Sequence, residues 1–166
     1  MSEFAVWAIA GGQMLLAADP RNMSAFQKKL LFNTEIIAVF LDTSGFRDVK
    51  EVDDTGRGIR GNAPPPPHPR CGCAKTKGGK CGCPQIWMRP LDDGGAALVL
   101  HNPNDTTAHT FTVNFGLFPK RSWGAATVLA VRDLFEHNDL GMSTGNYTTV
   151  HPVGPHGAVF LKLMPA

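Results

Sequence analysis

The stretch IWMRPLDDGGAALVLHN, residues 86–102, holds two apolar runs on either side of Asp92-Asp93-Gly94-Gly95. Two runs of strand length joined by a tight, glycine-containing turn predict an antiparallel hairpin. Further runs follow at short intervals, at residues 109–115, 126–135, 147–153 and 157–163. The turns predicted between the runs are 102–105, 138–141 and 154–157. We therefore expect residues 85–166 to form an antiparallel β-sandwich of about six to eight strands.

The first 42 residues differ from the rest because they are apolar and read mainly as helix. Residues 4–10 predict a buried helix that Gly11-Gly12 ends. The continuous apolar run 13–18 predicts a strand that is buried on both faces. Helix, strand and helix in succession are typical of an α/β layer, so we expect a separate and incomplete first domain.

Two local signals mark the helices that follow the predicted strand. Ser24, with Gln27 three residues later, has the form of a capping box at a helix start. A break near Asn33-Thr34 then separates this helix from a second one over residues 36–41.

Residues 43–84 are polar and irregular, and we expect an exposed excursion without regular structure. The cysteines of this segment, Cys71, Cys73, Cys81 and Cys83, form the pattern C-x-C-x7-C-x-C. The thiolates could bind zinc or copper, form two disulfides in a secreted protein, or belong to an unordered insertion. Structural zinc pairs usually have at least two residues between cysteines. A metal is therefore the weaker alternative, and we expect no metal site.

Composition excludes several classes of function. The chain has 166 residues, enough for one ordinary domain or a small domain plus part of another. A formal net charge of +2 gives no reason to expect nucleic acid or an anionic membrane as partner. The apolar N-terminus lacks the basic region of a signal peptide, and no apolar run reaches the length of a membrane-spanning helix. We expect no cofactor.

Several phrases in order carry a family resemblance. FAVWAIAGGQMLLAADPRNMS (4–24) and NTEIIAVFLD (33–42) resemble the end of the catalytic barrel in melibiase-type α-galactosidases and α-N-acetylgalactosaminidases. IWMRPLDDGGAALVLHNPND (86–105), VRDLFEHNDLG (131–141) and VHPVGPHGAVFLKL (150–163) resemble phrases of the sandwich that follows that barrel. The resemblance covers nearly the whole chain except residues 43–84.

The resemblance implies an α+β fragment with three parts. Residues 1–42 would be the last helix–strand–helix portion of a (β/α)8 barrel, residues 43–84 a linker with a Pro/Cys/Lys-rich insertion, and residues 85–166 the C-terminal β-sandwich. The family reaction is retaining hydrolysis of terminal α-galactosides, which needs two carboxyl groups about 5 Å apart. Both family aspartates belong to earlier barrel strands, so the resemblance implies no catalytic residue in this chain and no activity of the chain alone.

The resemblance also implies partners and location for the intact enzyme. Its substrate would be a galactoside, with no nucleic acid and no membrane as partner, and it allows a homodimer. Secretion or a lysosomal location would agree with three N-x-[ST] sequons at Asn22, Asn104 and Asn146. A rival interpretation from another class is a free-standing, non-catalytic β-sandwich that binds sugars or a protein partner.

Two other groups of residues need weighing. Asp19 and Arg21 follow the predicted barrel strand and could border the substrate pocket, but Asp19 more simply caps the next turn and pairs with Arg21. Asp133, Glu136, His137 and Asp139 resemble an acid–base site, yet we interpret the stretch as a strand and its hairpin, with a polar turn over 136–141. We predict a structural role, and no catalytic or metal-binding role, for His101, His151 and His156. We predict that Trp7, Trp87 and Trp123 are core residues.

Overall fold

The computed structural model describes residues 2–11, 19–43, 50–53, 83–118 and 120–166. The described helices are α1 (Ser2–Ala10), η1 (Pro20–Asn22), α2 (Ala25–Leu31), α3 (Thr34–Leu41) and η3 (Phe115–Leu117). The described strands are β1 (Lys50–Asp53), β2 (Gln85–Pro90), β3 (Ala96–His101), β4 (Thr112–Asn114), β5 (Val128–Asp133), β6 (Asn138–Thr144), β7 (Asn146–Thr148) and β8 (Ala158–Pro165). Within the described residues, no helix is both long and apolar enough to cross a bilayer.

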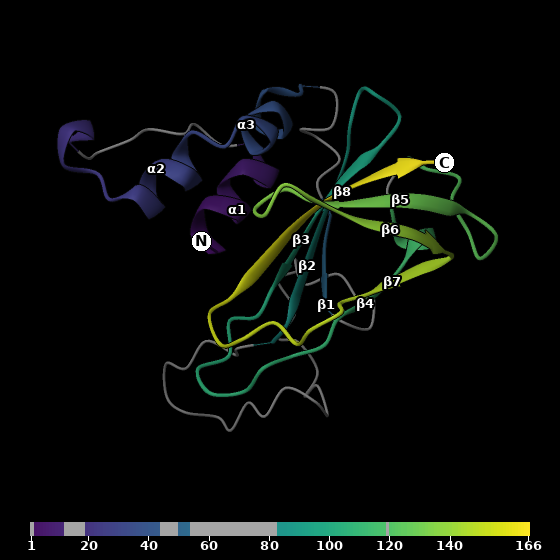
Figure 1. Ribbon diagram of the computed structural model, residues 1–166. Helices are drawn as coiled ribbons and strands as arrows, with labels where there is room; N and C mark the ends of the chain where they lie inside the picture. Colours follow the sequence, from purple (N-terminus) through teal and green to yellow (C-terminus); the bar gives the residue numbers. More distant parts are fainter. Residues whose placement is uncertain (1, 12–18, 44–49, 54–82, 119) are drawn as a thin grey trace, which may run out of the picture.

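Six strands form one antiparallel sheet in the order β1-β2-β3-β8-β5-β6, and β4 and β7 form a second sheet (Figure 1). The predicted hairpin is β2–β3, in which Gln85 pairs with His101 and Pro90 pairs with Ala96. The last strand, β8, lies between β3 and β5, so the end of the chain completes the middle of the large sheet. This topology confirms the predicted antiparallel β fold of the C-terminal half.

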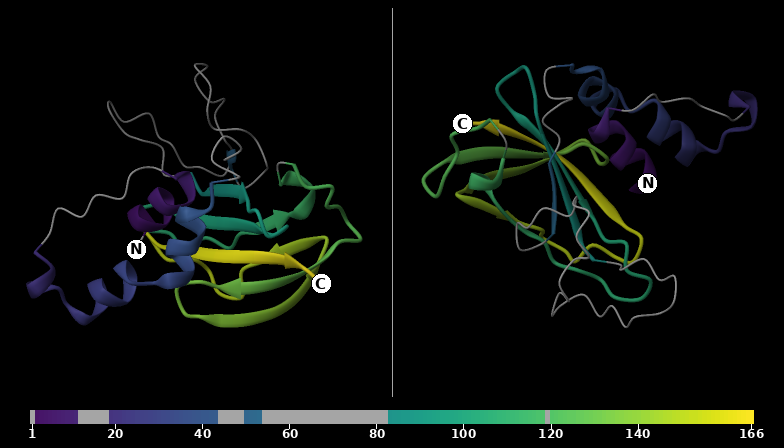
Figure 2. Two further views of the ribbon diagram at one scale, coloured as in Figure 1. Left: turned by 90° about the horizontal axis from the view of Figure 1, so that it is seen from above. Right: turned by 180° about the vertical axis from the view of Figure 1, so that it is seen from behind.

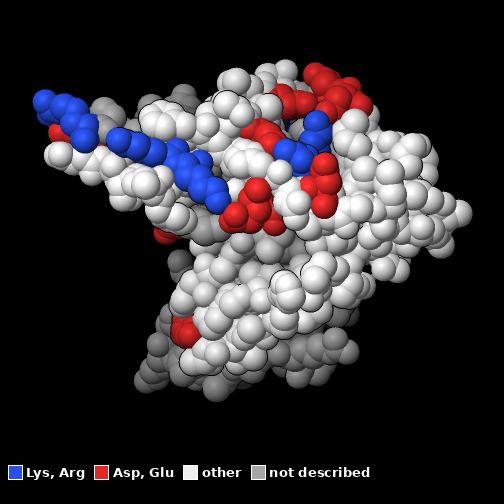
Figure 3. All heavy atoms as spheres, in the orientation of Figure 1, with Lys and Arg blue, Asp and Glu red and all other residues white. Residues whose placement is uncertain are grey.

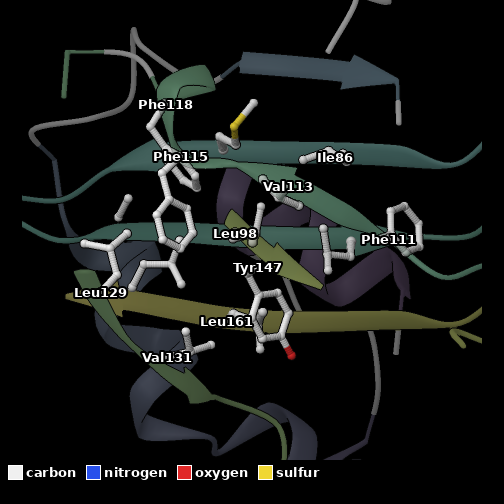
Figure 4. Close-up of a cluster of buried hydrophobic side chains, with 14 of the residues drawn as sticks. Ile86, Leu98, Phe111, Val113, Phe115, Phe118, Leu129, Val131, Tyr147 and Leu161 are labelled. Carbon is white, nitrogen blue, oxygen red and sulfur yellow. The ribbon is translucent and has the colours of Figure 1, made fainter. Parts of the chain in front are cut away.

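The inner core lies between the two sheets. Alternate side chains of the large sheet, such as Ile86, Leu98 and Leu161, contact Phe111 and Phe115 from the segment around β4 (Figure 4). All five of these side chains are fully buried. Burial of side chains at every second position is the pattern expected of a strand with one face toward a core.

A second core covers the opposite face of the large sheet. There α1 and α3 lie against the strands (Figure 2), and Ile9 and Ile36 pack with Trp87, Val99 and Phe160. Residues 96–100 of β3 are therefore buried on both faces, which explains why the sequence there is a continuous apolar run. The N-terminal helices and the sandwich share this core.

The helix boundaries follow the predicted signals. Gly11 adopts a φ of 69° directly after α1, and its N–H donates to the carbonyl of Trp7. Ser24 and Gln27 form the capping box of α2, with both reciprocal hydrogen bonds present. Asn33 caps α3, because its side chain accepts hydrogen bonds from the backbone N–H groups of Glu35 and Ile36. The predicted strand at 13–18 lies outside the described residues.

The helix α2 extends away from the two sheets (Figures 1 and 2). All seven of its residues are described, and none is buried. Phe26 and Phe32, within and directly after α2, are 55% and 63% exposed. We call residues 20–32, which contain η1 and α2, the arm.

Three predictions were wrong. Residues 138–141 form the start of the edge strand β6 and not a turn, since the turn lies at 134–137. No residue of the edge strand β6 is buried, although Leu140 packs partly against the inner core, and its polar and glycine residues resemble a turn in the sequence. Residues 50–53, expected to be irregular, form β1 on the other edge. Trp7 is 55% exposed, because α1 turns its smaller residues toward the sheet.

Candidate functional site

The VRDLFEHNDLG stretch forms the β5–β6 hairpin. A strand and its hairpin were predicted here, although the turn lies a few residues earlier than expected. Asp133 closes the turn of this hairpin, because its Oδ1 accepts hydrogen bonds from the backbone N–H groups of Phe135 at 2.8 Å and Glu136 at 3.1 Å. His137 ends the turn with a φ of 54°, in the left-handed region. The turn geometry brings Arg132, His137 and Asp139 to the face of the hairpin that meets α3.

The first turn of α3 lies against this hairpin. Asn33 accepts from the N–H groups of Glu35 and Ile36, and its Nδ2 donates to the carbonyl of Leu134 at 2.6 Å. One buried amide therefore both caps the helix and ties it to the β5–β6 turn. An asparagine can do both because its side chain carries one acceptor and one donor group.

Glu35 is the centre of a charged network across the same junction. Arg132 donates to both of its carboxylate oxygens, from Nε at 2.7 Å and from Nη2 at 2.8 Å. The Nδ1 atom of His137 lies 2.6 Å from Oε1 of Glu35, and Arg132 also donates from Nη1 to Asp139 at 2.8 Å. We call Asn33, Glu35, Arg132 and His137 the clasp.

The electrostatics of the clasp favour a charged Glu35. Hydrogen bonds from Arg132, followed by those from His137, outweigh partial burial and lower the pKa of Glu35 from 4.5 to about 2. The position of Glu35 in the first turn of α3 adds the favourable end of the helix dipole. The pKa of Arg132 is raised, mainly by its hydrogen bonds to Glu35 and Asp139. Glu35 therefore remains an anion over the whole neutral and mildly acidic range.

An ion pair also links the arm to the hairpin. Lys29 of α2 forms an ion pair with Glu136 at 3.0 Å, and both side chains are more than half exposed. Figure 3 shows the basic residues along α2 and the mixed acidic and basic groups over the junction of α3 with the hairpin. An exposed pair of this kind contributes little to stability.

The carboxylates around the junction are all engaged in structural contacts. A cavity of about 300 Å³ between α3 and the large sheet is lined by Glu35, Asp42 and Asp93, together with Arg132 and Lys162. The carboxylate of Asp42 accepts a hydrogen bond from the backbone N–H of Asp92 at 2.8 Å, and Asp93 forms an ion pair with Lys162 at 2.5 Å. Among the described residues, no group of His, Cys, Asp or Glu side chains is placed to hold a metal ion. The arrangement joins two parts of the fold and offers no acid–base pair.

Asp19, directly before the arm, contacts Arg21 within it. The carboxylate of Asp19 accepts from the backbone N–H of Arg21 at 3.0 Å and from its guanidinium at 2.8 Å. The side-chain hydrogen bond from Arg21 lowers the pKa of Asp19. Both contacts agree with the interpretation that Asp19 caps the next turn and pairs with Arg21. A role of the two residues in substrate binding stays a prediction.

The other predicted sites are distributed over the surface. Of the sequons, Asn22 and Asn146 are exposed, whereas Asn104 accepts from the N–H groups of Thr106 and Thr107 in its own loop. Cys83 is disulfide-bonded, and Cys71, Cys73 and Cys81 lie outside the described residues. Nothing in the described part of the chain brings these positions together with the clasp.

Sequence reasoning missed Glu35 and Arg89. The partners of Glu35 lie about 100 positions away along the chain, at Arg132 and His137, so local pattern gave no sign of them. Arg89 on β2 is fully buried and donates to the carbonyls of Ala8 and Ile9 at the end of α1. Burial lowers its pKa. A lone arginine in a strand facing a core was the only available signal.

Comparison with known proteins agrees with this architecture. Residues 81–163 match the family described as the alpha-galactosidase C-terminal beta-sandwich domain. A probable alpha-galactosidase of Dictyostelium discoideum is 25% identical over 99% of this chain, and alpha-galactosidase 3 of Arabidopsis thaliana is 29% identical over 85%. The crystal structure of alpha-galactosidase I from Mortierella vinacea superposes on 99% of the chain with a TM-score of 0.73 at 21% identity.

The relatives are much longer than this chain. It spans 35% of the Dictyostelium protein, 26% of the Arabidopsis protein and 35% of the Mortierella chain. The matched region begins at residue 81, just before β2, and ends within β8, so it contains all of β2 to β7. The chain therefore belongs to the alpha-galactosidase C-terminal beta-sandwich family.

Proposed function

We propose that this chain is the C-terminal part of a retaining α-galactosidase. In this proposal residues 1–42 are the end of the (β/α)8 barrel, residues 43–84 the linker with its insertion, and residues 85–166 the terminal sandwich. The observation that carries the proposal is the match of 99% of the chain to about a third of proteins named alpha-galactosidase. Such a match is what a C-terminal part of such an enzyme would give.

Exposed apolar side chains between α2 and the end of α3 support the barrel assignment. Phe26 and Phe32 of the arm are more than half exposed, and so is Leu41 at the end of α3. Exposed apolar side chains that lie close together in a sequence are often covered in the complete protein. In the proposed enzyme the remaining strands and helices of the barrel would cover them.

The proposal includes catalytic inactivity of the chain alone. Retaining hydrolysis requires a nucleophilic carboxylate and a second carboxyl group that protonates the leaving oxygen, about 5 Å apart. The acids near the clasp each have a structural partner, and Asp19 pairs with Arg21. The nucleophile and the acid/base would come from earlier barrel strands, and the substrate would be a terminal α-galactoside.

Activity of the purified chain tests this proposal directly. With 4-nitrophenyl α-D-galactopyranoside, we expect no release of nitrophenol above a buffer control. Hydrolysis that follows the chain through purification would overturn the inactivity. The DNA immediately upstream of the codon for Met1 is the complementary test. An in-frame extension that encodes further barrel strands with a Tyr-Asp-x-Cys and an Asp-Pro-Asp-Met phrase is expected, and a stop codon without them would contradict the proposal.

One observation favours the second candidate, a free-standing module. The helices α1 and α3 already share a buried core with β2, β3 and β8, so much of the N-terminal segment is satisfied without a barrel. Sedimentation of the purified chain separates the two candidates. A soluble, stable monomer favours the module, whereas aggregation through the arm favours the C-terminal part of a larger enzyme.

A further inference from the structure

An open cavity lies where the first turns of α1 meet the start of β2 and the end of β3. Its volume is about 330 Å³, within the range of small-ligand sites. The lining residues are Ser2, Glu3, Val6, Trp7, Gln85, His101, Pro103 and His156. Both the helical segment and the sandwich contribute walls, so the cavity exists only while α1 lies on the sheet. It is separate from the clasp and from the arm.

Trp7 gives this cavity an aromatic wall. Its side chain is 55% exposed, whereas Ala5, Ala8 and Ile9 of the same helix are fully buried against the sheet. The face of an indole ring is electron-rich and attracts groups with a partial positive charge. The C–H groups on one face of a pyranose ring carry such a charge and present a flat apolar surface of matching size.

The polar groups of the cavity suit hydroxyl groups. Gln85 and His101 are cross-strand neighbours, and Nδ1 of His101 lies 2.8 Å from Oε1 of Gln85. Because an amide oxygen only accepts, the imidazole proton lies on Nδ1 and Nε2 remains an acceptor. The amide nitrogen of Gln85 remains a donor, and the carboxylate of Glu3 is a second acceptor. Donors and acceptors side by side are what a polyol requires.

The charge of the cavity argues against other ligand classes. Burial, with a smaller contribution from His156, lowers the pKa of His101 and so favours its neutral ring. Nε2 of His156 lies 3.1 Å from the carboxylate of Asp105, which would repel an anionic ligand at this edge of the cavity. A purely apolar ligand would remove water from the polar groups without replacing its hydrogen bonds. A neutral molecule with one apolar face and several hydroxyl groups fits best.

We propose that this cavity is a non-catalytic binding site for a terminal pyranose, stacked on Trp7 and hydrogen-bonded to Gln85, His101 and Glu3. The choice of galactose as the sugar rests on the proposed function, while the pyranose class rests on the cavity alone. In an α-galactosidase such a site would hold a second galactosyl group of the substrate or product away from the reaction centre.

Titration of the ¹⁵N-labelled chain with methyl α-D-galactopyranoside tests the proposal. We expect the indole N–H signal of Trp7 and the side-chain amide signals of Gln85 to move saturably, with a Kd of about 1–10 mM, a common strength for a single small ligand. The indole signal of Trp123, which packs against the inner core, should not move. Mannitol, a linear polyol without a ring face, should give no saturable shift.

Two variants complete the test. Trp7→Ala should weaken binding at least tenfold, and a folded spectrum elsewhere checks that the variant is intact. Phe32→Ala removes an equally exposed aromatic side chain from the arm and should bind the sugar unchanged. Absence of saturable shifts, shifts of the same size with mannitol, or unchanged binding in Trp7→Ala would each overturn the site. The hydrolysis assay tests the proposed function independently, because the release of nitrophenol does not depend on this cavity.

Discussion

Replacement of Glu35 by glutamine tests whether the clasp holds the N-terminal helices on the sandwich. The lowered pKa of Glu35, about 2 against a usual value of 4.5, corresponds to about 3 kcal/mol of stability if taken in full. Solvent reaches the pair, since the side chains of Arg132 and Glu35 are 35% and 28% exposed. Screening reduces the expected loss for Glu35→Gln to about 1–2 kcal/mol at pH 7. Urea unfolding followed by tryptophan fluorescence measures it, because Trp87 lies in the core shared with α1 and α3.

The pH dependence gives this prediction its sign. The folded-state pKa of Glu35 is depressed, so its contribution is complete above about pH 4.5 and is lost as pH falls through about 2. The difference between the wild-type chain and Glu35→Gln should therefore shrink over this interval. Asp139→Asn is the matched control, because Asp139 binds the same Arg132 but is 79% exposed, and it should cost at most about 0.5 kcal/mol. Equal stability of Glu35→Gln and wild type at pH 7, or a difference that persists undiminished at pH 2, would refute the reasoning.

Three further substitutions probe other parts of the fold by urea or thermal unfolding. Asn33→Ala removes the cap of α3 and its hydrogen bond to the β5–β6 turn, and should lower the free energy of unfolding by about 2–3 kcal/mol. A decrease below about 0.5 kcal/mol would show that the junction does not depend on this amide. Phe160→Ala should lose about 3–5 kcal/mol because the ring is fully buried among the helices and the sheet, whereas Phe32→Ala, on the exposed arm, should stay within about 0.5 kcal/mol; similar effects would contradict the assigned burial. Gly145→Ala should lower the free energy of unfolding by about 2 kcal/mol or more, since the φ of Gly145 is +70° and a Cβ would lie 2.5 Å from a backbone oxygen. Gly124→Ala is the control, because a Cβ there meets no atom within 4 Å and stability should hardly change. Unchanged stability of Gly145→Ala would contradict this prediction.

Sequence predicted the elements whose signals are local. The glycine after α1, the capping box at Ser24 and the helix break near Asn33-Thr34 each depend on a few neighbouring residues, so they could be predicted directly. The hairpin β2–β3 was predicted because a tight turn joins two apolar runs. Local patterns also predicted an α/β segment before the β-sandwich, and the resemblance added the prediction that this segment is the end of a (β/α)8 barrel.

The errors share a physical cause, which is that burial depends on partners distant in sequence. Residues 138–141 are polar because β6 is an edge strand, and polarity alone predicts a turn. Trp7 was predicted to be a core residue, yet α1 packs Phe4, Ala5, Ala8 and Ile9 on the sheet, and the indole of Trp7 lies beside an open cavity. The hairpin was correctly interpreted as structural, but its partner Glu35, about 100 positions earlier, could not be predicted from local sequence.

The double-sided burial of β3 limits how this polypeptide can be divided. A cut at residue 85 would keep every sandwich strand except β1, yet it would expose Trp87, Val99 and Phe160 to water. A recombination event that moved the sandwich to a new gene without its preceding helices would therefore give a protein with an exposed apolar face that is prone to aggregate. Helices and sandwich are expected to be inherited together, as one unit of evolutionary exchange.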